Sequence, residues 1–464
     1  MEYISTRGGP EALSFADVFL SGLARDGGLY VPKSLPQWSA RDIASLAGRP
    51  YAECATRIMA PFVAPDICEA DLADIVDKAY SAFPHAEVAP LRHLGDNEWL
   101  LELFHGPTLA FKDVALQLVG HLFEHLLNAR GQRITVLGAT SGDTGSAAID
   151  ALKGRDCAEV FMLHPKGRVT EVQRRQMTTI DAANVHNIAV EGTFDDCQAM
   201  VKAAFNDLAF RDETGLSAIN SINWARVMAQ TVYYFTSAVA LGAPQREVTY
   251  AVPTGNFGDG YAGYVARGMG LPIDRLIIAT NANDIVARAL GGGEYRVGAI
   301  HHTISPSMDI QVSSNFERLL FDLYDRDGKE ITRLMTELQT AGGFAINAEP
   351  LARARVIFAG CSVSEDETRA CMANMFQEHG LVIDPHTAIA VHAARGLGNK
   401  SGHPMVVLST AHPAKFPDVV REVTGETPSL PGHLADLFER EERFDVLPND
   451  VAALKAYIRA RAER

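Results

Sequence analysis

One lysine, Lys112, lies where the sequence could support carbonyl chemistry. It belongs to the segment LFHGPTLAFKD at residues 103–113, in which a turn rich in Gly and Pro leads into an apolar helical pattern over residues 114–127. A lysine at such a junction is partly desolvated, and desolvation lowers the pKa of an amine. Schiff-base formation with a carbonyl cofactor requires a neutral amine of this kind. The alternative is a solvated surface charge, which the spacing alone does not exclude.

The segment TSGDTG at residues 140–145 is a candidate anion site. It follows a predicted strand at residues 134–137 and precedes a predicted helix at residues 146–152. Glycines and small hydroxyl residues expose backbone N–H groups at the start of a helix, and such groups bind carboxylates and phosphates. The simpler alternative is a strand-to-helix turn capped by one of its polar side chains. Both interpretations stay open, because capping and anion binding are compatible.

A second Gly-rich segment, TGNFGDG at residues 254–260, follows a predicted strand at residues 248–252 and precedes a predicted helix near residues 261–268. Its three glycines allow the backbone to approach a ligand closely and to adopt positive φ angles. The segment is neither a Walker sequence nor a GxGxxG motif with a suitably placed acid. It indicates a phosphate cradle, with a tight turn as the alternative.

Two further segments carry groups that could bind a ligand. NSINWAR at residues 220–226 offers an amide, a hydroxyl and the guanidinium of Arg226, which can bind a phosphate or carboxylate through two parallel hydrogen bonds. LSTAHPAKF at residues 408–416 ends a predicted strand and places Thr410 at the sheet edge where ligands bind. Each has a simpler alternative when taken alone: a surface arginine beside a helix cap, and a capping threonine.

The order of the predicted elements indicates the fold class. Short apolar strands alternate with longer helical patterns, which predicts an α/β protein with parallel sheets covered by helices on both faces. Ligands of such sheets bind beyond the carboxyl ends of the strands, and both Gly-rich segments fall there. Residues 42–83 are predicted to be mainly helical. The strands are predicted at residues 134–137, 248–252, 276–280 and 405–408.

Length, charge and cysteine content exclude several classes of protein. A chain of 464 residues exceeds one ordinary core, so two or three subdomains are expected. The net charge of −15 argues against general nucleic-acid binding, and an anionic ligand therefore needs a local group of cations and N–H donors. No apolar run reaches membrane-spanning length and no secretory signal is present, which predicts a cytoplasmic location. The six cysteines lack CxxC and metal-site spacing, so we predict reduced thiols and no metal.

In combination, these segments resemble the threonine synthase family. LFHGPTLAFKD, TSGDTG, NSINWAR, TGNFGDG, SPSMDIQVSSNFER at residues 305–318 and STAHPAKF occur in the order found in that family. The opening, from YISTRGG to LARDGGLYVP, is similar to the N-terminal segment of its longer branch, and the resemblance covers nearly the whole chain. It implies a fold-type II pyridoxal-phosphate enzyme, tryptophan synthase beta-like, with the cofactor between two α/β domains. The implied division is an N-terminal region (1–97), an α/β domain with the cofactor lysine (98–234) and a second α/β domain with the phosphate loop (235–464).

The resemblance also implies a role for each candidate residue. Lys112 would form the internal aldimine, Thr410 would face the pyridine nitrogen, and Asp143 would lie beside the phenolic oxygen, where related enzymes usually have asparagine. Five consecutive residues would surround the cofactor phosphate, mostly through backbone N–H groups: Gly255, Asn256, Phe257, Gly258 and Asp259. Six residues would contact the substrate phosphate: Thr140, Ser141, Thr144, Asn220, Ser221 and Arg226.

The implied reaction converts O-phosphohomoserine and water to threonine and inorganic phosphate, the last step of threonine biosynthesis. Pyridoxal phosphate would act as the electron sink, Lys112 as the base at Cα, and Arg226 would stabilise the departing phosphate. The nearest alternative is a phospho-lyase of the same family that releases 2-oxobutyrate. A dehydratase suits the phosphate-binding segment less well, and a catalytically dead homologue is disfavoured by the intact Lys112. The sequence leaves the choice between monomer and homodimer open.

Overall fold

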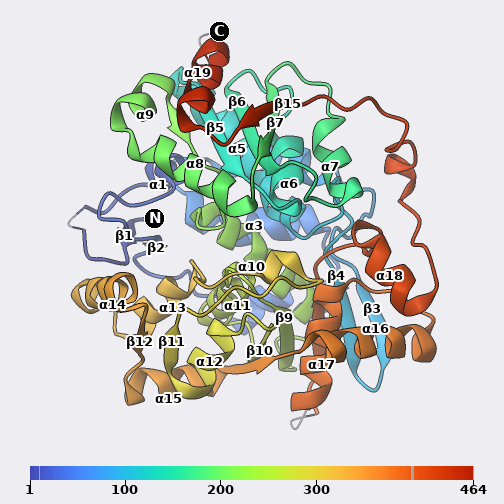
Figure 1. Ribbon diagram of the computed structural model, residues 1–464. Helices are drawn as coiled ribbons and strands as arrows, with labels where there is room; N and C mark the ends of the chain where they lie inside the picture. Colours follow the sequence, from blue (N-terminus) through green and yellow to red (C-terminus); the bar gives the residue numbers. More distant parts are fainter. Residues whose placement is uncertain (10, 399–401, 463–464) are drawn as a thin grey trace. The chain divides into compact units, whose positions relative to one another are not determined.

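The computed structural model describes residues 1–9, 11–398 and 402–462 and divides the chain into two compact units (Figure 1). The large unit contains Met1–Asp77, Phe83–His105 and Ser221–Pro428. The small unit contains Lys78–Ala82, Gly106–Asn220 and Ser429–Arg464. Each unit is therefore assembled from separate stretches of chain, which differs from the three consecutive domains predicted with boundaries at residues 97 and 234.

The small unit is built on a five-stranded, fully parallel sheet in the order β15-β7-β6-β5-β8. Its strands are β5 (Ile134–Ala139), β6 (Ala158–Pro165), β7 (Val185–Glu191), β8 (Leu216–Ser217) and β15 (Asp445–Pro448). Its helices are α5 (Lys112–Arg130), α6 (Asp143–Leu152), α7 (Glu171–Thr178), α8 (Phe194–Asn206), α9 (Leu208–Thr214), η3 (Gly432–Leu434) and α19 (Val451–Ala462).

The C-terminal segment belongs to the small unit because β15 pairs in parallel with β7. Val446 lies opposite Ala189 in this pairing, far from it in sequence. The following helix α19 contributes Leu454 and Ile458, both fully buried, to one core with residues of β5, β6, β7 and α8. Burying this apolar face holds residues 445–462 on the unit that residues 106–220 form.

The large unit is built on a six-stranded sheet in the order β13-β10-β9-β14-β4-β3, parallel except for β3. Its sheet strands are β3 (Leu91–Gly95), β4 (Glu98–Glu102), β9 (Val248–Pro253), β10 (Ile273–Thr280), β13 (Phe358–Ser362) and β14 (Met405–Ser409). Two small antiparallel pairs are formed by β1 (Tyr3–Ser5) with β2 (Tyr30–Pro32) and by β11 (Glu294–Arg296) with β12 (Gly343–Ala345).

The helices of the large unit come from its N-terminal and C-terminal stretches alike (Figure 1). The N-terminal stretch supplies α1 (Phe15–Ser21), α2 (Ala40–Ala44), α3 (Tyr51–Val63) and most of α4 (Glu69–Tyr80). The stretch after residue 220 supplies α10 (Trp224–Ala240), α11 (Gly258–Gly268), α12 (Ile285–Gly292), η1 (Pro306–Met308), α13 (Phe316–Leu323), α14 (Gly328–Ala341), α15 (Ala348–Ile357), α16 (Glu365–His379), α17 (Pro385–Leu397), η2 (Pro413–Lys415) and α18 (Pro417–Thr424).

The predicted strands and helices are confirmed, with ends that differ by a few residues. The strands expected at residues 134–137, 248–252, 276–280 and 405–408 are β5, β9, β10 and β14. The helices predicted after the two Gly-rich segments are α6 and α11, and each begins inside its segment. The Gly-rich segments thus lie at carboxyl ends of parallel strands, as the α/β pattern predicted.

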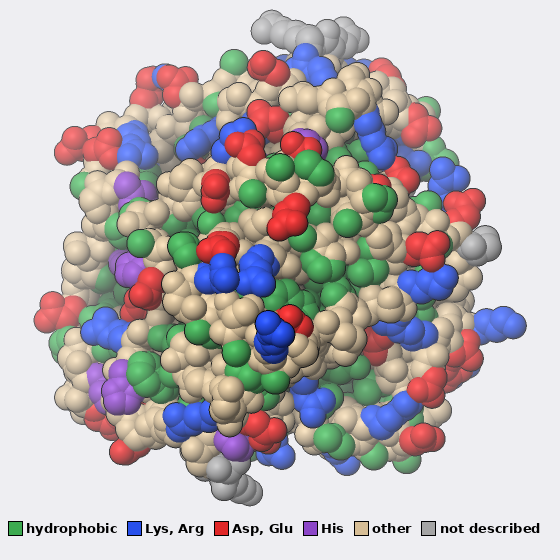
Figure 2. All heavy atoms as spheres, turned by 180° about the vertical axis from the view of Figure 1, so that it is seen from behind, with side chains coloured by type: hydrophobic (Ala, Val, Ile, Leu, Met, Phe, Trp, Pro, Cys, Tyr) green, Lys and Arg blue, Asp and Glu red, His purple; other side chains and the backbone are tan. Residues whose placement is uncertain are grey.

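Charge is mixed on the surface. On the face drawn in Figure 2, Lys and Arg side chains alternate with Asp and Glu side chains. Charges of both signs are thus mixed on this face. In a chain of net charge −15, a strongly anionic ligand requires locally grouped donors. Within the described ranges, no helix is long and apolar enough to cross a membrane.

Candidate functional site

The turn before Lys112 is fixed by Asp113. This aspartate is fully buried, and its carboxylate accepts hydrogen bonds from the backbone N–H (2.8 Å) and the hydroxyl (2.6 Å) of Thr108. A Cβ on Gly106 would lie 2.3 Å from the Cβ of Asp113, so no larger residue fits there. Lys112, the first residue of α5, therefore follows a turn that is held rigidly.

Lys112 lies beside Asp143 within the small unit. The Nζ of Lys112 is 3.7 Å from Oδ2 of Asp143 and 5.7 Å from the ring centroid of Phe111. The side chains of the lysine and the aspartate are only 11% and 4% exposed. Because 3.7 Å exceeds hydrogen-bond length, the carboxylate stabilises positive charge on the amine without a direct hydrogen bond.

The turn between β5 and α6 is capped by Thr140. Its buried Oγ1 accepts hydrogen bonds from the N–H groups of Gly142 and Gly145, both at 2.9 Å. Gly142 has φ of 144°, and a Cβ there would lie 2.4 Å from the amide carbon of Gln173. The amide nitrogen of Gln173 donates to Oδ1 of Asp143 at 2.8 Å. The hydroxyl of Thr140 therefore closes the turn before α6, whose N-cap residue is Gly142, and Gln173 orients the carboxylate that faces Lys112.

The remaining polar residues predicted on this side are partly accessible. Ser141, in the same turn as Thr140, and Thr144, in the first turn of α6, are half-buried. Asn220 is also half-buried and is the last residue of this stretch of the small unit. The next residue along the chain, Ser221, begins the stretch that belongs to the large unit. Ser141, Thr144 and Asn220 thus belong to the small unit, and Ser221 belongs to the large unit.

The second Gly-rich segment joins β9 to α11, and its left-handed residue is Phe257. Phe257 has φ of 59°, and its buried ring packs edge-on against Phe316 with centroids 5.4 Å apart. Such a backbone conformation costs a non-glycine residue about 1–3 kcal/mol, and core packing holds it in place. The expectation that glycines of this segment adopt positive φ is wrong. Gly255 is required for space instead, because a Cβ there would lie 2.9 Å from the carbonyl oxygen of Ser307.

The backbone of this segment presents a row of hydrogen-bond donors. Among the described residues, no hydrogen bond uses the N–H groups of Gly255, Asn256, Phe257 or Gly258. Helix α11 begins at Gly258, so the positive end of its dipole adds to these donors. Consecutive unpaired N–H groups at a helix N-terminus form a site for phosphate or carboxylate.

The side chain of Asp259 faces α10 and not the row of N–H donors. Its Oδ1 accepts hydrogen bonds from the Gln230 amide at 2.8 Å and from the Tyr233 hydroxyl, and its carbonyl oxygen accepts one from the Tyr234 hydroxyl at 2.9 Å. Burial together with this carboxylate raises the pKa of Tyr233 well above its ordinary value, so the phenol remains a donor. Any contact of Asp259 with a ligand at the loop is left to its backbone.

A segment with no predicted site residue surrounds this loop. Ser313 donates its hydroxyl to the carbonyl oxygen of Gly255 at 2.8 Å, and Ser314 donates to Oδ1 of Asn256 at 3.0 Å. The backbone N–H and the side-chain amide of Asn315 both donate to the carbonyl oxygen of Asn256, at 3.1 and 3.0 Å. Residues 313–315 therefore determine the shape of the loop. In the sequence they were noted only as part of the segment 305–318 that resembles the family, and no site role was predicted for them.

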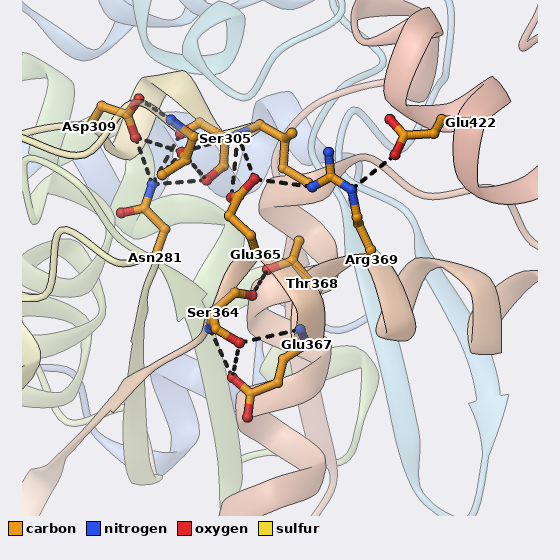
Figure 3. A network of polar contacts seen from close by, with 11 residues as sticks. Asn281, Ser305, Asp309, Ser364, Glu365, Glu367, Thr368, Arg369 and Glu422 are labelled. Carbon is orange, nitrogen blue, oxygen red and sulfur yellow. Dashed lines mark hydrogen bonds and ion pairs between the residues drawn. The ribbon is translucent and has the colours of Figure 1, made fainter.

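The loop that contains Ser307 is anchored by a polar network (Figure 3). Asp309 accepts a hydrogen bond from the Asn281 amide at 2.8 Å, which ties the loop to the end of β10. Glu365, at the start of α16, accepts from the backbone N–H of Ile304 at 3.4 Å and from Arg369 at 3.1 Å. The chain that packs against Gly255 is thus fixed to two elements of the large unit.

Arg226, on the first turn of α10, is a buried cation. Only 4% of the residue is exposed, and within the described ranges Nε and Nη1 of its guanidinium have no hydrogen-bond partner. Burial lowers its pKa to about 10, and the neighbouring Asp259 carboxylate opposes this effect. A buried charge with unpaired N–H groups is costly, which indicates that an anion belongs nearby.

Thr410 directly follows β14, at the carboxyl end of the sheet. It is 5% exposed, and no hydrogen bond within the described part of the chain uses its hydroxyl. The preceding residue, Ser409, bonds through its hydroxyl to Thr387 at 3.0 Å, and the buried Asp384 caps α17 beside it. The strand end is thus fixed while the Thr410 hydroxyl is left to a ligand.

These groups match the chemistry of pyridoxal phosphate. A buried lysine beside a carboxylate can bind the aldehyde, a row of N–H donors at a helix start can bind the phosphate, and a threonine hydroxyl can bond to a ring nitrogen. The row of N–H donors around Gly255 and the unpaired nitrogens of Arg226 also supply what an anion needs in a net-acidic chain. The donor set therefore fits the cofactor.

Three family models match the chain. They are described as "Threonine synthase N terminus" over residues 2–80, "Pyridoxal-phosphate dependent enzyme" over residues 84–345 and "Threonine synthase, C-terminal" over residues 387–458. The threonine synthase of Pseudomonas aeruginosa is 55% identical over 100% of this chain and 99% of its own length. The threonine synthase of Saccharomyces cerevisiae is 42% identical over 97% of this chain and 93% of its own length.

Solved structures give the same relationship. The chain is similar to pyridoxal-phosphate-bound threonine synthase from Brucella melitensis with a TM-score of 0.98 and 51% identity, and all of both chains is covered. Threonine synthase from Escherichia coli matches with a TM-score of 0.83 and 32% identity over 99% of this chain and 100% of that one. Maize serine racemase, at a TM-score of 0.50 and 13% identity over 73% of this chain and 92% of that one, shares the fold alone.

Proposed function

The chain belongs to the threonine synthase family of pyridoxal-phosphate enzymes, and we propose that its substrate is O-phosphohomoserine, which it converts with water to threonine and inorganic phosphate. The observation that carries the proposal is Arg226, a buried guanidinium whose Nε and Nη1 have no hydrogen-bond partner among the described residues, in a chain of net charge −15. Such a group accounts for a strongly anionic substrate. The phosphate of O-phosphohomoserine supplies such an anion in addition to the carboxylate that every amino acid carries.

Pyridoxal phosphate, when bound, supplies an electron sink for charge that develops at the substrate carbons. We assign Lys112 to the covalent attachment of this group through Nζ and then to removal of the Cα proton. Asp143, 3.7 Å from Nζ, stabilises the amine in its protonated form after that transfer. Gln173 keeps the carboxylate oriented, since its amide holds Oδ1 at 2.8 Å.

We assign the cofactor phosphate to the backbone N–H groups of Gly255, Asn256, Phe257, Gly258 and Asp259. The N–H groups of residues 255–258, which make no hydrogen bond to any described residue, and the start of α11 support this assignment. We assign Thr410 to the pyridine nitrogen, where a hydroxyl can donate a hydrogen bond without giving up its proton. This arrangement suits a ring nitrogen that is not fully protonated.

We assign the substrate phosphate to Arg226 and to polar residues of the segments 140–145 and 220–226. The hydroxyls of Thr140, Ser141, Thr144 and Ser221 and the amide of Asn220 are short neutral donors. These donors can bind the phosphate both when it is part of the substrate and after it has left, because they carry no charge of their own. Arg226 stabilises the negative charge that develops on the phosphate as it departs.

A reducing cytoplasm is the location that we propose. The cysteines of the described chain are all free, and four of them are buried: Cys54, Cys157, Cys197 and Cys371. Burial raises the pKa of Cys197 and of Cys371 to about 12, so these thiols are inert. Free, unreactive thiols are typical of a reducing compartment.

Product analysis tests the proposed reaction against the phospho-lyase alternative. Purified holoenzyme is incubated with O-phosphohomoserine, and inorganic phosphate, threonine and 2-oxobutyrate are measured in the same samples. We expect threonine to form in an amount equal to phosphate. Phosphate release matched by 2-oxobutyrate would identify a phospho-lyase, and no phosphate release would remove O-phosphohomoserine as the substrate.

A further inference from the structure

Arg318 is a fully buried cation on α13 that contacts separate stretches of the large unit. Its Nε donates to the carbonyl oxygen of Tyr30 at 3.0 Å, and its Nη2 donates to the carbonyl oxygen of Ile222 at 2.5 Å. Its Nη1 donates to Oδ1 of Asn315. The guanidinium carbon lies 5.7 Å from the ring of Trp224. Burial lowers the pKa of Arg318 to about 10, so these contacts must offset a desolvation cost.

The contact with Asn315 determines how that side-chain amide is oriented. A guanidinium has donors only, so it must face Oδ1 of the amide and not the nitrogen. The amide nitrogen of Asn315 then donates to the carbonyl oxygens of Ser221 at 3.1 Å and of Asn256 at 3.0 Å. A flipped amide would place its oxygen against both carbonyl oxygens. One arginine therefore enforces the donor orientation that connects residue 221 with residue 256.

We propose that Arg318 is a positioning residue for the reaction. Through Asn315 and Ile222 it fixes the spacing between the substrate-binding stretch at residues 221–226 and the cofactor-phosphate loop at residues 255–259. Arg318 touches neither ligand itself and acts through the carbonyl and amide groups that it holds. This inference rests on the proposed function of those two stretches.

Arg326 provides a matched control for a purely structural role. It donates to the carbonyl oxygens of Pro32 at 3.0 Å and Lys33 at 2.8 Å, and it pairs with Asp322 at 2.9 Å. Its guanidinium carbon lies 5.8 Å from an aromatic ring, much as in Arg318. Both arginines thus hold the N-terminal stretch to the region of α13. Within the described residues, none of these contacts of Arg326 reaches the substrate stretch or the segment 313–315.

The first experiment compares Arg318→Met and Arg326→Met holoenzymes. Equilibrium dialysis gives the Kd for pyridoxal phosphate, steady-state kinetics give kcat and KM for O-phosphohomoserine, and thermal unfolding gives Tm. We expect Arg318→Met to raise both Kd and KM by about tenfold or more, because a buried amide loses its partner. Arg326→Met should lower Tm while Kd and KM stay at the wild-type values. Equal effects of the two substitutions on Kd and KM would overturn the proposal.

Asn315→Asp separates positioning from folding. The aspartate retains an oxygen for Arg318 and adds an ion pair, but it replaces the shared donor with an acceptor that faces Ser221 and Asn256. We expect Kd and KM to rise as in Arg318→Met while Tm is maintained, and unchanged Kd and KM would overturn the proposal. Arg318→Lys should recover only part of the loss, since an ammonium cannot reproduce the planar fork.

The Gly258→Val variant distinguishes two negative results: that Arg318 is not a positioning residue, and that residues 255–259 do not bind the cofactor phosphate. If Gly258→Val leaves the affinity for pyridoxal phosphate unchanged, the loop is not the phosphate site and the assigned function of residues 255–259 fails. If Gly258→Val weakens that affinity but Arg318→Met and Asn315→Asp do not, the loop assignment stands and the role of Arg318 is wrong.

Discussion

The Nζ of Lys112 lies 3.7 Å from Oδ2 of Asp143, and both groups are buried within the small unit. Each is positioned by a second residue of the same unit. Asp113 fixes the turn that precedes Lys112, and Gln173 holds the far oxygen of Asp143. The amine and the carboxylate are thus fixed independently of any ligand, which is the preorganisation expected of a base that must return to one place in every cycle.

Lys112→Ala should abolish both covalent cofactor attachment and turnover. Alanine has no amine, and the visible absorbance of the lysine-bound cofactor should be absent from purified protein with unchanged circular dichroism. Lys112→Arg should fail as well, because a guanidinium stays protonated. Lys153→Ala is the control, since Lys153 lies half-exposed on the same unit and pairs with Asp150. Retention of absorbance and activity in Lys112→Ala would contradict the assignment.

Gly106→Ala should destabilise the turn that carries Lys112. The added Cβ would lie 2.3 Å from the Cβ of Asp113 and would break the contact of that carboxylate with Thr108. Overpacking of this kind costs about 1–3 kcal/mol of unfolding free energy, which urea unfolding measures. Gly396→Ala serves as the control, because nothing lies within 4 Å of the added carbon. Equal stability of the two variants would show that the turn is not held by Asp113.

Much of the fold could be predicted because the strands and helices of a parallel α/β protein have recognisable local sequence patterns. The apolar runs that became β5, β9, β10 and β14 are short, are bounded by turn residues and are followed by helical patterns. The return of β15 to the small unit could not be predicted, because its pairing with β7 joins residues more than 250 positions apart. No local pattern records such a contact.

The candidate site could be predicted only where one segment carries the chemistry. Lys112, the N–H donors near Gly255 and the buried Arg226 each follow from a local motif, although the role of each stays a prediction. The residues that shape the loop could not be found in this way. Asn315 meets Asn256 across 59 residues of sequence, and a lone Asn has a surface role in most contexts. The left-handed Phe257 was missed as well, because core packing and not a small side chain holds its backbone.

Gly258→Val should weaken cofactor binding. A Cβ on Gly258 would make only ordinary contacts, 3.4 Å from the Gln230 amide oxygen and 3.6 Å from the Asn315 amide nitrogen, whereas two further methyl groups project into the space between them. We expect the Kd for pyridoxal phosphate to rise by about tenfold or more, and equilibrium dialysis measures it. Gly258→Ala should have a much smaller effect. A similar Kd for wild type and both variants would make the loop a simple turn.

Acid should destabilise the protein through His164. This histidine is buried on β6, and burial lowers its pKa to about 4, below its ordinary value of 6.5. Between these pH values the unfolded chain binds a proton at His164 that the folded chain does not bind. The contribution of the neutral histidine to the unfolding free energy is therefore fully present above about pH 6.5 and is lost as the pH falls towards 4. When the pH is lowered from about 7 to about 5, the unfolding free energy of His164→Gln should fall by up to about 2 kcal/mol less than that of wild type. Urea unfolding at both pH values measures this, and parallel pH profiles would exclude His164 as the cause.

Arg226→Leu should separate activity from stability. The Nε and Nη1 of Arg226 make no hydrogen bond to any described residue, so leucine removes a costly buried charge and breaks no hydrogen bond from those atoms. The Asp259 carboxylate keeps its bonds from Gln230 and Tyr233. We therefore expect the unfolding free energy to be equal to that of wild type or higher.

The same substitution should lower kcat/KM for O-phosphohomoserine by about two orders of magnitude or more, since a desolvated charge-assisted contact contributes roughly 2–5 kcal/mol. The visible absorbance of bound cofactor should remain, because Arg226 is assigned to the substrate. Arg226→Lys should recover part of the activity, since a point charge replaces a planar fork. Steady-state kinetics, spectra and urea unfolding of the same samples decide between the possibilities. Normal kcat/KM would place the substrate phosphate elsewhere, lost absorbance would assign Arg226 to the cofactor, and a large loss of stability would show that its charge supports the fold.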